Sequence, residues 1–501
     1  MDRKKKKWSW PLFMLISGTV LVGLWSGCRP EREDTARLDV DETVDGTYGN
    51  EAVLLNDTFR IDISEIRLTL TYHPDSATVD GTSRIRFSMR PGQSRPLLHF
   101  NPAAGGQALQ YLQLDDRVWS NPADGIRVRQ FEGSTQQAIE IQQDVEPGSE
   151  HLLVIGYSLH FPANYPMFST QVNDLQGIGN EEIFPTINSP HELIRHLITL
   201  QVDSAAPYRC IGSGLVEKTD NSALQEWTLD SEKQVASYGI MFALAPTADT
   251  LYQERTIAGV PVRIVAFAGG ASIAAAFAEL DSWLPQLQAE IAPFPMPRGL
   301  SIFLTNSGGG MEYYGGTTSS LPALSHEVFH MYFGCSAIAR TYRDSWWDEA
   351  ITSWYDRTYP AYLVPINEGY QSNIVSGRSP IAVGFDPRAY YQGSQIMETL
   401  AQRLGGRTAM TRFLSQVYRA HAWSPFATMD LADYFHDYSG IDIRDDFRNW
   451  FYRGSATTTG AAPSPIAEEK KVDLSPPAAV LEKYRSFGGP TASHGRIANE
   501  N

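Results

Sequence analysis

Hydrophobic and polar residues alternate along the first half of the chain. The runs FRIDISEIRLTLTYHP, TSRIRFSMR, HLLVIGYSLHF and LIRHLITLQVD follow this pattern, and turns rich in Gly, Pro, Asn and Asp separate them. Alternation with a period of two is typical of strands with one buried face. Because no long stretch of helical period interrupts residues 55–248, we expect an N-terminal β-domain of sandwich or saddle type there.

The pattern changes after residue 248. VPVRIVAFAG and RGLSIFLTN have the continuous apolar character of buried strands, whereas ASIAAAFAELDSWLPQLQAEIA has apolar residues at helical spacing. Helical patterns dominate residues 322–453. We therefore expect an α+β protein of two domains, in which residues 249–454 form a mixed α/β catalytic domain that ends in helices.

The two ends of the chain have a different character. Residues 1–27 join a basic segment to an apolar one and end in small residues before Cys28, as an export signal does. This arrangement resembles the lipobox of bacterial lipoproteins, in which the cysteine carries lipid, although Trp25 stands where leucine is usual. An ordinary signal peptide or an uncleaved membrane anchor is the alternative. Residues 28–54 are expected to form an acidic tether, and residues 455–501 a mostly disordered tail.

The composition and charge of the chain limit the classes of partner that it can bind. The chain has 501 residues, 42% of them hydrophobic, with a net charge of −16 and a pI near 5.2. An acidic surface argues against nucleic acid as the main partner. Cys210 and Cys335 lie in different predicted domains, so we expect two buried thiols rather than a disulfide. We expect a monomer anchored in a membrane through Cys28, and Arg29 favours the outer membrane or the cell surface.

A metal site is predicted in SHEVFHMYFGCSAIARTYRDSWWDEA, residues 325–350. On a helix, His326 and His330 lie on one face, one turn apart, so that both rings reach one ion. Glu327 would lie beside the metal, where a general base for water belongs. A catalytic zinc needs a third protein ligand, and Glu349 is the candidate. A buried helix that happens to contain histidines is the alternative, because the bare HExxH motif is also found in structural helices.

Two further segments suit a site that handles peptides. GGGMEYYGG (308–316) follows a predicted strand, and its glycines let the backbone pass close to a ligand. Glu312 in this segment is a candidate to bind the ammonium group of a peptide's N-terminus. AYYQGS (389–394) begins a predicted helix and offers tyrosine hydroxyls to a developing oxyanion. Each segment also has a simpler explanation when it is considered alone. GGGMEYYGG can be a glycine turn with a solvated glutamate, and the tyrosines of AYYQGS can be a pair of core aromatics.

The order of these motifs resembles the aminopeptidase N family of zinc metallopeptidases, which includes leukotriene hydrolase. The family's Gly-x-Met-Glu-Asn motif reads Gly309-Gly310-Met311-Glu312-Tyr313 here, so that tyrosine replaces the usual asparagine. HEVFH, an eighteen-residue gap and Glu349 match the zinc ligands. The Tyr-x-x-Gly motif matches AYYQGS and selects Tyr390 over Tyr391 as the catalytic phenol.

The resemblance covers roughly residues 55–454 and implies a β-saddle domain followed by a thermolysin-like domain. Segment 183–203 resembles the family's Phe-Pro-x-x-Asp-x-Pro region, with Asn188 in place of Asp, and STQVND implies that Gln171 contacts substrate. The gap from Glu312 to His326 is shorter than is usual. The sequence shows no counterpart of the large C-terminal helical domain that many family members have. We therefore expect a more open cleft that admits longer peptides. Glycyl-aminopeptidases share a similar glycine-rich run, but their third ligand usually lies further away.

The function implied is a zinc-dependent aminopeptidase that acts on peptide substrates. His326, His330 and Glu349 would bind one Zn²⁺, and Glu327 would move protons to and from water and the leaving amine. Tyr390 would stabilise the oxyanion, while Glu312 and Gln171 would hold the substrate ammonium. The alternatives are an endopeptidase with the same site, a peptide-binding lipoprotein without activity, and a hydrolase of small molecules.

Overall fold

The computed structural model describes residues 60–451 except 101–107, 131–136, 161–167, 171–179, 181–182, 188–189, 191, 220–223, 307–308, 341–343, 358–359, 368–373 and 375–387. The predicted export signal, Cys28, the tether, the tail, Gln171 and Asn188 lie outside the described residues. In the described ranges, no helix combines the length and the apolar character needed to cross a membrane. The domain limits given above stay predictions.

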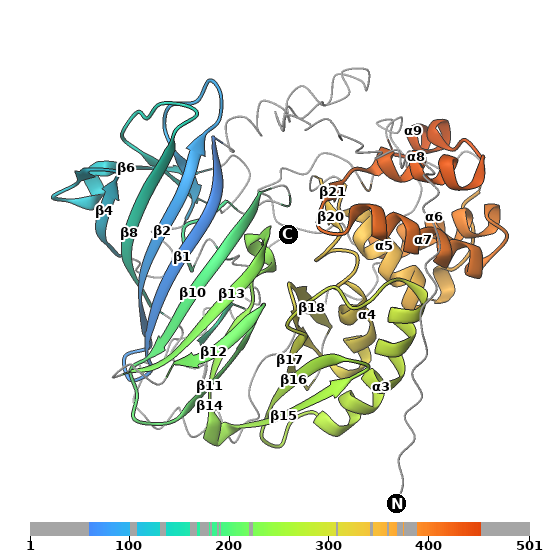
Figure 1. Ribbon diagram of the computed structural model, residues 1–501, viewed down its shortest axis with the longest axis horizontal. Coiled ribbons are helices and arrows are strands. Elements are labelled where there is room, and N and C mark those ends of the chain that lie inside the picture. The colour runs from blue at the N-terminus through green and yellow to red at the C-terminus, as the bar shows by residue number, and fades with distance from the viewer. Residues whose placement is uncertain are drawn as a thin grey trace, which may run out of the picture. The chain divides into compact units, whose positions relative to one another are not determined.

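The N-terminal half is built on an eight-stranded sheet (Figure 1). Its strands, from one edge to the other, are β12 (Leu215–Thr219), β13 (Gln225–Ala236), β10 (Leu193–Val202), β1 (Ile61–His73), β2 (Thr78–Met89), β8 (Glu150–His160), β4 (Ala108–Leu114) and β5 (Arg117–Val118). Neighbouring strands run antiparallel, except that β1 and β10 are parallel. The four alternating runs of the sequence are thus confirmed as β1, β2, β8 and β10.

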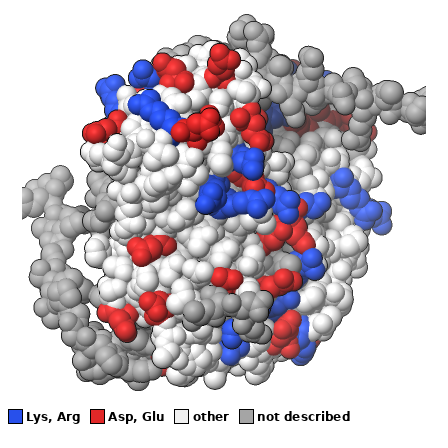
Figure 2. All heavy atoms as spheres, turned by 60° about the vertical axis from the view of Figure 1, so that its left-hand side comes forward, with Lys and Arg blue, Asp and Glu red and all other residues white. Residues whose placement is uncertain are grey.

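Alternation explains why these segments form strands. In β1, Ile66, Leu68 and Leu70 are buried, while Arg67 and Thr69 between them are exposed. The outward positions carry charges that pair across strands, such as Glu65 of β1 with Arg86 of β2. Figure 2 shows acidic and basic side chains interspersed on the face that it displays, without a single-sign patch.

Two small sheets complete the N-terminal half. The first contains β3 (Leu97–His99), β7 (Gln137–Ile141) and β6 (Ile126–Gln130); the second contains β11 (Tyr208–Gly212), β14 (Phe242–Pro246) and β9 (Phe168–Ser169). Between β13 and β14 lies a short 3-10 turn, η4 (Ser237–Gly239). Cys210 in β11 is buried and free, and so is Cys335, as expected from the sequence.

A mixed five-stranded sheet begins at residue 250. Its order is β15 (Thr250–Ile257), β16 (Val260–Phe267), β17 (Leu300–Leu304), β19 (Gly316–Ser319) and β18 (Gly310–Tyr313). Strand β18 is an edge strand that pairs antiparallel with β19. It carries the GGMEY motif, so the sheet places this motif at its border rather than in its centre.

Helices follow the sheet, and the first two of them, α3 and α4, pack against it (Figure 1). They are α3 (Ile273–Glu290), α4 (Leu324–Phe329), α5 (Trp346–Asp356), α6 (Arg388–Arg403), α7 (Arg407–His421), α8 (Thr428–Ser439) and α9 (Arg444–Phe451). Two short parallel strands, β20 (Ile338–Ala339) and β21 (Pro425–Phe426), link the helical part to the loop after α4. The described residues therefore combine a multi-sheet N-terminal part with an α/β part that ends in helices.

A shared apolar cluster holds β18 against the N-terminal half. Tyr313 of β18 is 2% exposed and packs with Met241 before β14, Ile211 of β11 and Phe303 of β17. The backbone N–H of Tyr314 also donates to the carbonyl of Gly239 in η4, at 2.7 Å. Burial of large side chains contributes about 1.5–3 kcal/mol each, so this cluster stabilises the strand that carries Glu312.

Candidate metal centre and peptide site

The three predicted ligands meet at one point. His326 lies in the short helix α4 and His330 directly follows it, while Glu349 lies in the first turn of α5. Glu349 Oε2 is 2.9 Å from His326 Nε2 and 3.3 Å from His330 Nε2. All three residues are at most 7% exposed, and their donor atoms lie within 4.8 Å of one another.

These residues fit a zinc ion. The Nε2 atom of His330 is buried and has no hydrogen-bond partner in the described residues. It is within ion-pairing distance of Glu349, but the geometry is not that of a hydrogen bond. Two imidazole nitrogens and one carboxylate form a donor set found in catalytic zinc sites, which keep a further position open. Buried polar atoms normally form a hydrogen bond, so a buried ring nitrogen without one fits a metal ligand.

Two aspartates orient the histidine rings. Asp356 Oδ2 lies 2.9 Å from His326 Nδ1, and Asp348 Oδ1 lies 2.6 Å from His330 Nδ1. Such partners fix which ring nitrogen faces the metal and raise its basicity. The sequence analysis did not identify either residue. A signal was present, because Asp356 lies seven residues after Glu349 and therefore on the same face of α5.

The acidic groups around the two histidines favour binding of a cation. Burial lowers the pKa of His326, but hydrogen bonds to Asp356 and Glu349 outweigh it and raise the pKa to about 10. Burial would raise the pKa of Glu349, yet the nearby His330 and His326 lower it well below its usual range. Protonated histidines and ionised carboxylates are thus favoured together, which reflects an excess of acidic groups that a divalent ion would balance.

Glu327 lies between the metal ligands and the strand β18. It is 4% exposed, and a Cβ atom at Gly310 would come within 2.3 Å of its carboxyl carbon. A side chain at position 310 would therefore displace the carboxylate of Glu327. Burial raises the pKa of Glu327 to about 8 against the attraction of His326, and the charge of Glu312 adds to the rise. A carboxylate whose pKa is raised toward neutral pH suits a general base.

Glu312 is brought to the same place by β18. Donor atoms of Glu312, Glu327 and His330 lie within 4.8 Å of one another. Burial raises the pKa of Glu312 to about 7, against the attraction of His330. Neighbouring residues of the motif differ in environment, since Met311 is 41% exposed and the Gly309 carbonyl accepts from Ser320 N. The structure thus places Glu312, but not Met311, beside the predicted metal ligands.

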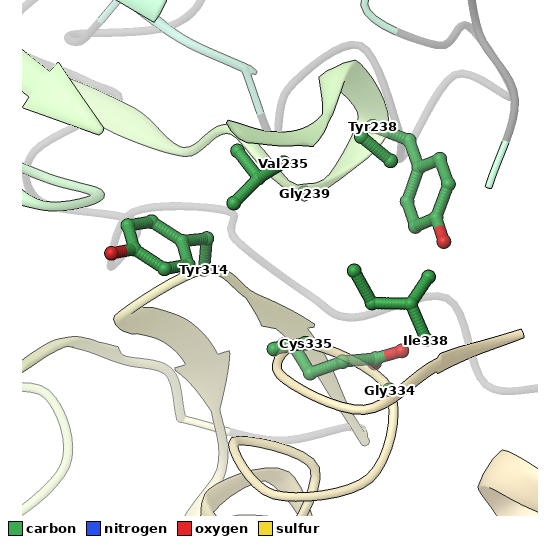
Figure 3. A pocket seen from close by; sticks show the side chains of 9 residues that line it. Val235, Tyr238, Gly239, Tyr314, Gly334, Cys335 and Ile338 are labelled. Carbon is green, nitrogen blue, oxygen red and sulfur yellow. The ribbon is translucent and has the colours of Figure 1, made fainter. Parts of the chain in front are cut away.

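A pocket opens beside Glu312. It lies between η4, the turn from β18 to β19 and the loop after α4, and its walls are mainly apolar (Figure 3). The side chains labelled in Figure 3 are Val235, Tyr238, Gly239, Tyr314, Gly334, Cys335 and Ile338. The N-terminal half therefore contributes one wall of the space around Glu312.

Tyr390 reaches the site from α6. Its hydroxyl donates to Glu349 Oε1 at 2.6 Å, and its ring stacks on His326 with 6.0 Å between centroids. Tyr391 instead packs on Tyr362. Burial raises the pKa of Tyr390 well above its usual value, and the charge of Glu349 adds to this. Tyr390 therefore stays protonated and can donate to an oxyanion.

Solved structures share this fold. The M1 zinc metallopeptidase of Deinococcus radiodurans is 17% identical, with a TM-score of 0.60, and the match covers 82% of this chain and 100% of that one. A variant of it bound to a Tyr-Ser-Ala substrate is 18% identical, with a TM-score of 0.60, over 80% of this chain and 96% of that one.

Aminopeptidase A of Legionella pneumophila, in complex with aspartic acid, is 12% identical with a TM-score of 0.62; the match covers 79% of this chain and 50% of that one. No family model matches the chain, and no curated protein matches it by sequence. The likeness of fold and the meeting of HEVFH with Glu349 agree with the resemblance drawn from the sequence. The described chain has the fold of the M1 zinc metallopeptidases.

Proposed function

We propose that this chain is a zinc-dependent aminopeptidase that removes N-terminal residues from peptides. The observation that carries the proposal is the position of Glu312, whose carboxylate lies within 4.8 Å of donor atoms of Glu327 and His330. A carboxylate at this distance from the general base can hold a free ammonium group while the first peptide bond lies at the metal. One of the solved structures with the same fold is bound to a Tyr-Ser-Ala substrate.

The described residues divide the chemistry among them. His326, His330 and Glu349 would hold a zinc ion, which when bound polarises the scissile carbonyl and makes water more acidic. Glu327 accepts the proton of the attacking water and delivers it to the leaving amine. Tyr390 donates its hydroxyl proton in a hydrogen bond to the carbonyl oxygen as charge develops there. Glu312 binds the substrate's ammonium group and thereby selects peptides with a free N-terminus.

The test uses the full chain, purified in mild detergent, and a peptide pool of which half carries acetylated N-termini. We expect loss of single residues from the free peptides only, as measured by mass spectrometry. A chelator and the Glu327→Gln variant should both abolish this loss. Glu279→Gln, at a half-buried glutamate of α3 that is not among the predicted site residues, is the matched control and should behave like the wild type.

Other outcomes point to the alternatives. Internal cuts in both halves of the pool would establish an endopeptidase and remove the role given to Glu312. Bound zinc without any cleavage would favour a peptide-binding protein.

We also propose that Cys28 carries a lipid that anchors the protein in a membrane. The proposal rests on the residues that precede the cysteine in the sequence. Mass spectrometry of the N-terminal peptide should show cleavage before Cys28 and acyl chains on that residue. An intact N-terminus with an unmodified thiol would contradict it.

A further inference from the structure

A second pocket lies between α7 and α8, two helices that contact each other directly (Figure 1). Its volume is about 220 Å³. None of its lining residues is a predicted metal ligand, and none lines the pocket beside Glu312. The residues that line it are Phe413, Gln416, Val417, Tyr434, Asp437 and Tyr438.

The inner surface of this pocket is apolar and aromatic. Phe413 and Val417 of α7 are at most 1% exposed. The ring of Tyr438 lies against that of Phe413, with 5.5 Å between centroids and 54° between the ring planes. Apolar side chains of this kind pack against methylene groups, and aromatic rings attract a cation that comes within about 6 Å. The pocket therefore suits an aliphatic chain that carries a positive charge.

The carboxylate of Asp437 gives the pocket a negative charge that no arginine or lysine balances. Helix α8 contains three aspartates. Asp430 pairs with Arg340 at 2.9 Å, and Asp433 pairs with Arg444 at 2.8 Å. Asp437, in contrast, forms no ion pair or hydrogen bond within the described residues, and no basic side chain lines the pocket. The carboxylate is thus available to a positively charged ligand.

We propose that this pocket binds a lysine side chain of a polypeptide. A lysine ammonium has three N–H donors and no acceptor. The carboxylate of Asp437, the amide oxygen of Gln416 and the hydroxyl oxygen of Tyr434 supply three acceptors at the pocket. Like Asp437, neither Gln416 nor the hydroxyl of Tyr434 has a hydrogen-bond partner in the described part of the chain. The methylene groups of the lysine pack on Phe413 and Val417. The proposal does not rest on the proposed peptidase activity.

Saturation-transfer difference NMR tests the proposal with the full chain in mild detergent. The probe is Nα-acetyl-lysine amide, in which the side chain carries the only positive charge. The norleucine analogue lacks the ammonium group, and the trimethyllysine analogue keeps the charge but has no N–H donor. Hydrogen bonds to charged groups are the strong ones, so we expect both analogues to bind about tenfold more weakly than the lysine compound. Added salt should weaken binding of the lysine compound.

Variants assign the binding to this pocket. Asp437→Asn keeps the shape of the side chain but removes its charge, and we expect binding about tenfold weaker. Tyr434→Phe keeps the ring and removes the hydroxyl, so its loss should be smaller. Asp445→Asn is the matched control, because that aspartate is exposed and pairs with Arg448 on α9. It should bind the lysine compound like wild type, and equal thermal melts would show that all three variants are folded.

Three results would overturn the proposal. Equal binding of the lysine and norleucine compounds would mean that the contact is only apolar. Equal binding of the lysine compound by wild type and Asp437→Asn would place it at another acidic group, such as Glu312. Tighter binding of the trimethyllysine compound would assign the pocket to quaternary ammonium groups instead. An absence of transfer to the lysine compound at every concentration would also contradict it.

Discussion

Asp348 and Asp356 are single residues whose carboxylates hold the two histidine rings in place. Replacing either by asparagine keeps the shape but removes the charge that makes the ring a better ligand. Because such partners typically contribute 10- to 100-fold in metal affinity, we expect Asp348→Asn and Asp356→Asn to weaken zinc binding by about that factor. Competition with a coloured chelator measures the affinity.

Asp281→Asn is the control for this prediction, because that aspartate is half-exposed and pairs with Arg255 on the surface. Its zinc affinity should equal that of wild type. If Asp348→Asn and Asp356→Asn also bind zinc as tightly as wild type, the rings are held by packing alone. For His330 that packing would include the Phe333 carbonyl, 3.2 Å from its Nδ1.

At the scale of elements, the contact between α5 and α6 sets the distance from Glu349 to Tyr390. Gly393 lies where the helices touch, and a Cβ atom there would be 2.5 Å from Cβ of Ala350. Helix propensity alone would make Gly393→Ala stabilising by roughly 0.5–1 kcal/mol. Overpacking costs about 1–3 kcal/mol, so we expect a net loss of stability together with a fall in kcat as Tyr390 moves.

Urea unfolding and steady-state kinetics together test this prediction. Gln395→Ala, two residues further along α6, adds no volume at the contact and should change neither quantity appreciably. A more stable Gly393→Ala variant with unchanged kcat would show that the two helices can separate without disturbing the site.

At the scale of the whole molecule, zinc should stabilise the folded chain, because its ligands come together only on folding. Three ligands spread over 24 residues of sequence meet through the packing of α4 on α5. A ligand present at 1,000 times its Kd contributes about 4 kcal/mol to the free energy of unfolding. We expect chelation to lower the melting temperature of wild type by several degrees and that of His330→Ala hardly at all. Equal melting curves with and without chelator in wild type would mean that no zinc is bound.

Acid should destabilise the N-terminal half through two buried histidines. Burial lowers the pKa of His99 to about 4 and that of His196 to about 3, whereas both take up protons near pH 6.5 when unfolded. Between pH 6.5 and about 4, the unfolded chain therefore binds more protons than the folded chain. In this window the free energy of unfolding therefore decreases as the pH is lowered, by about 1.4 kcal/mol per pH unit for each histidine.

Urea unfolding at several pH values, with chelator present so that loss of metal does not contribute, measures this dependence. His99→Gln and His196→Gln should each show a shallower decline toward acid, by about one proton. If both variants decline as steeply as wild type, other groups are responsible for the acid sensitivity.

The sequence alone determined the kinds of elements and most of the metal ligands. Alternation of period two predicts β1, β2, β8 and β10, because it follows from local backbone geometry and one-sided burial. The spacing of His326 and His330 reflects the helical repeat in the same way. The need of a catalytic zinc for a third protein ligand made Glu349 a candidate, and the eighteen-residue gap then matched the zinc ligands of a known family.

Only the tertiary structure decided which side chains meet across elements. Local periodicity places Asp356 on the same face of α5 as Glu349, but the contact of Asp348 and Asp356 with the backs of the two rings depends on how α4 and α5 pack. Glu312 and Glu327 are fifteen residues apart in sequence and become neighbours because β18 lies at the sheet edge beside α4. Adjacent tyrosines on a helix point in directions about 100° apart, so the packing of α6 on α5 decides that Tyr390, and not Tyr391, reaches Glu349.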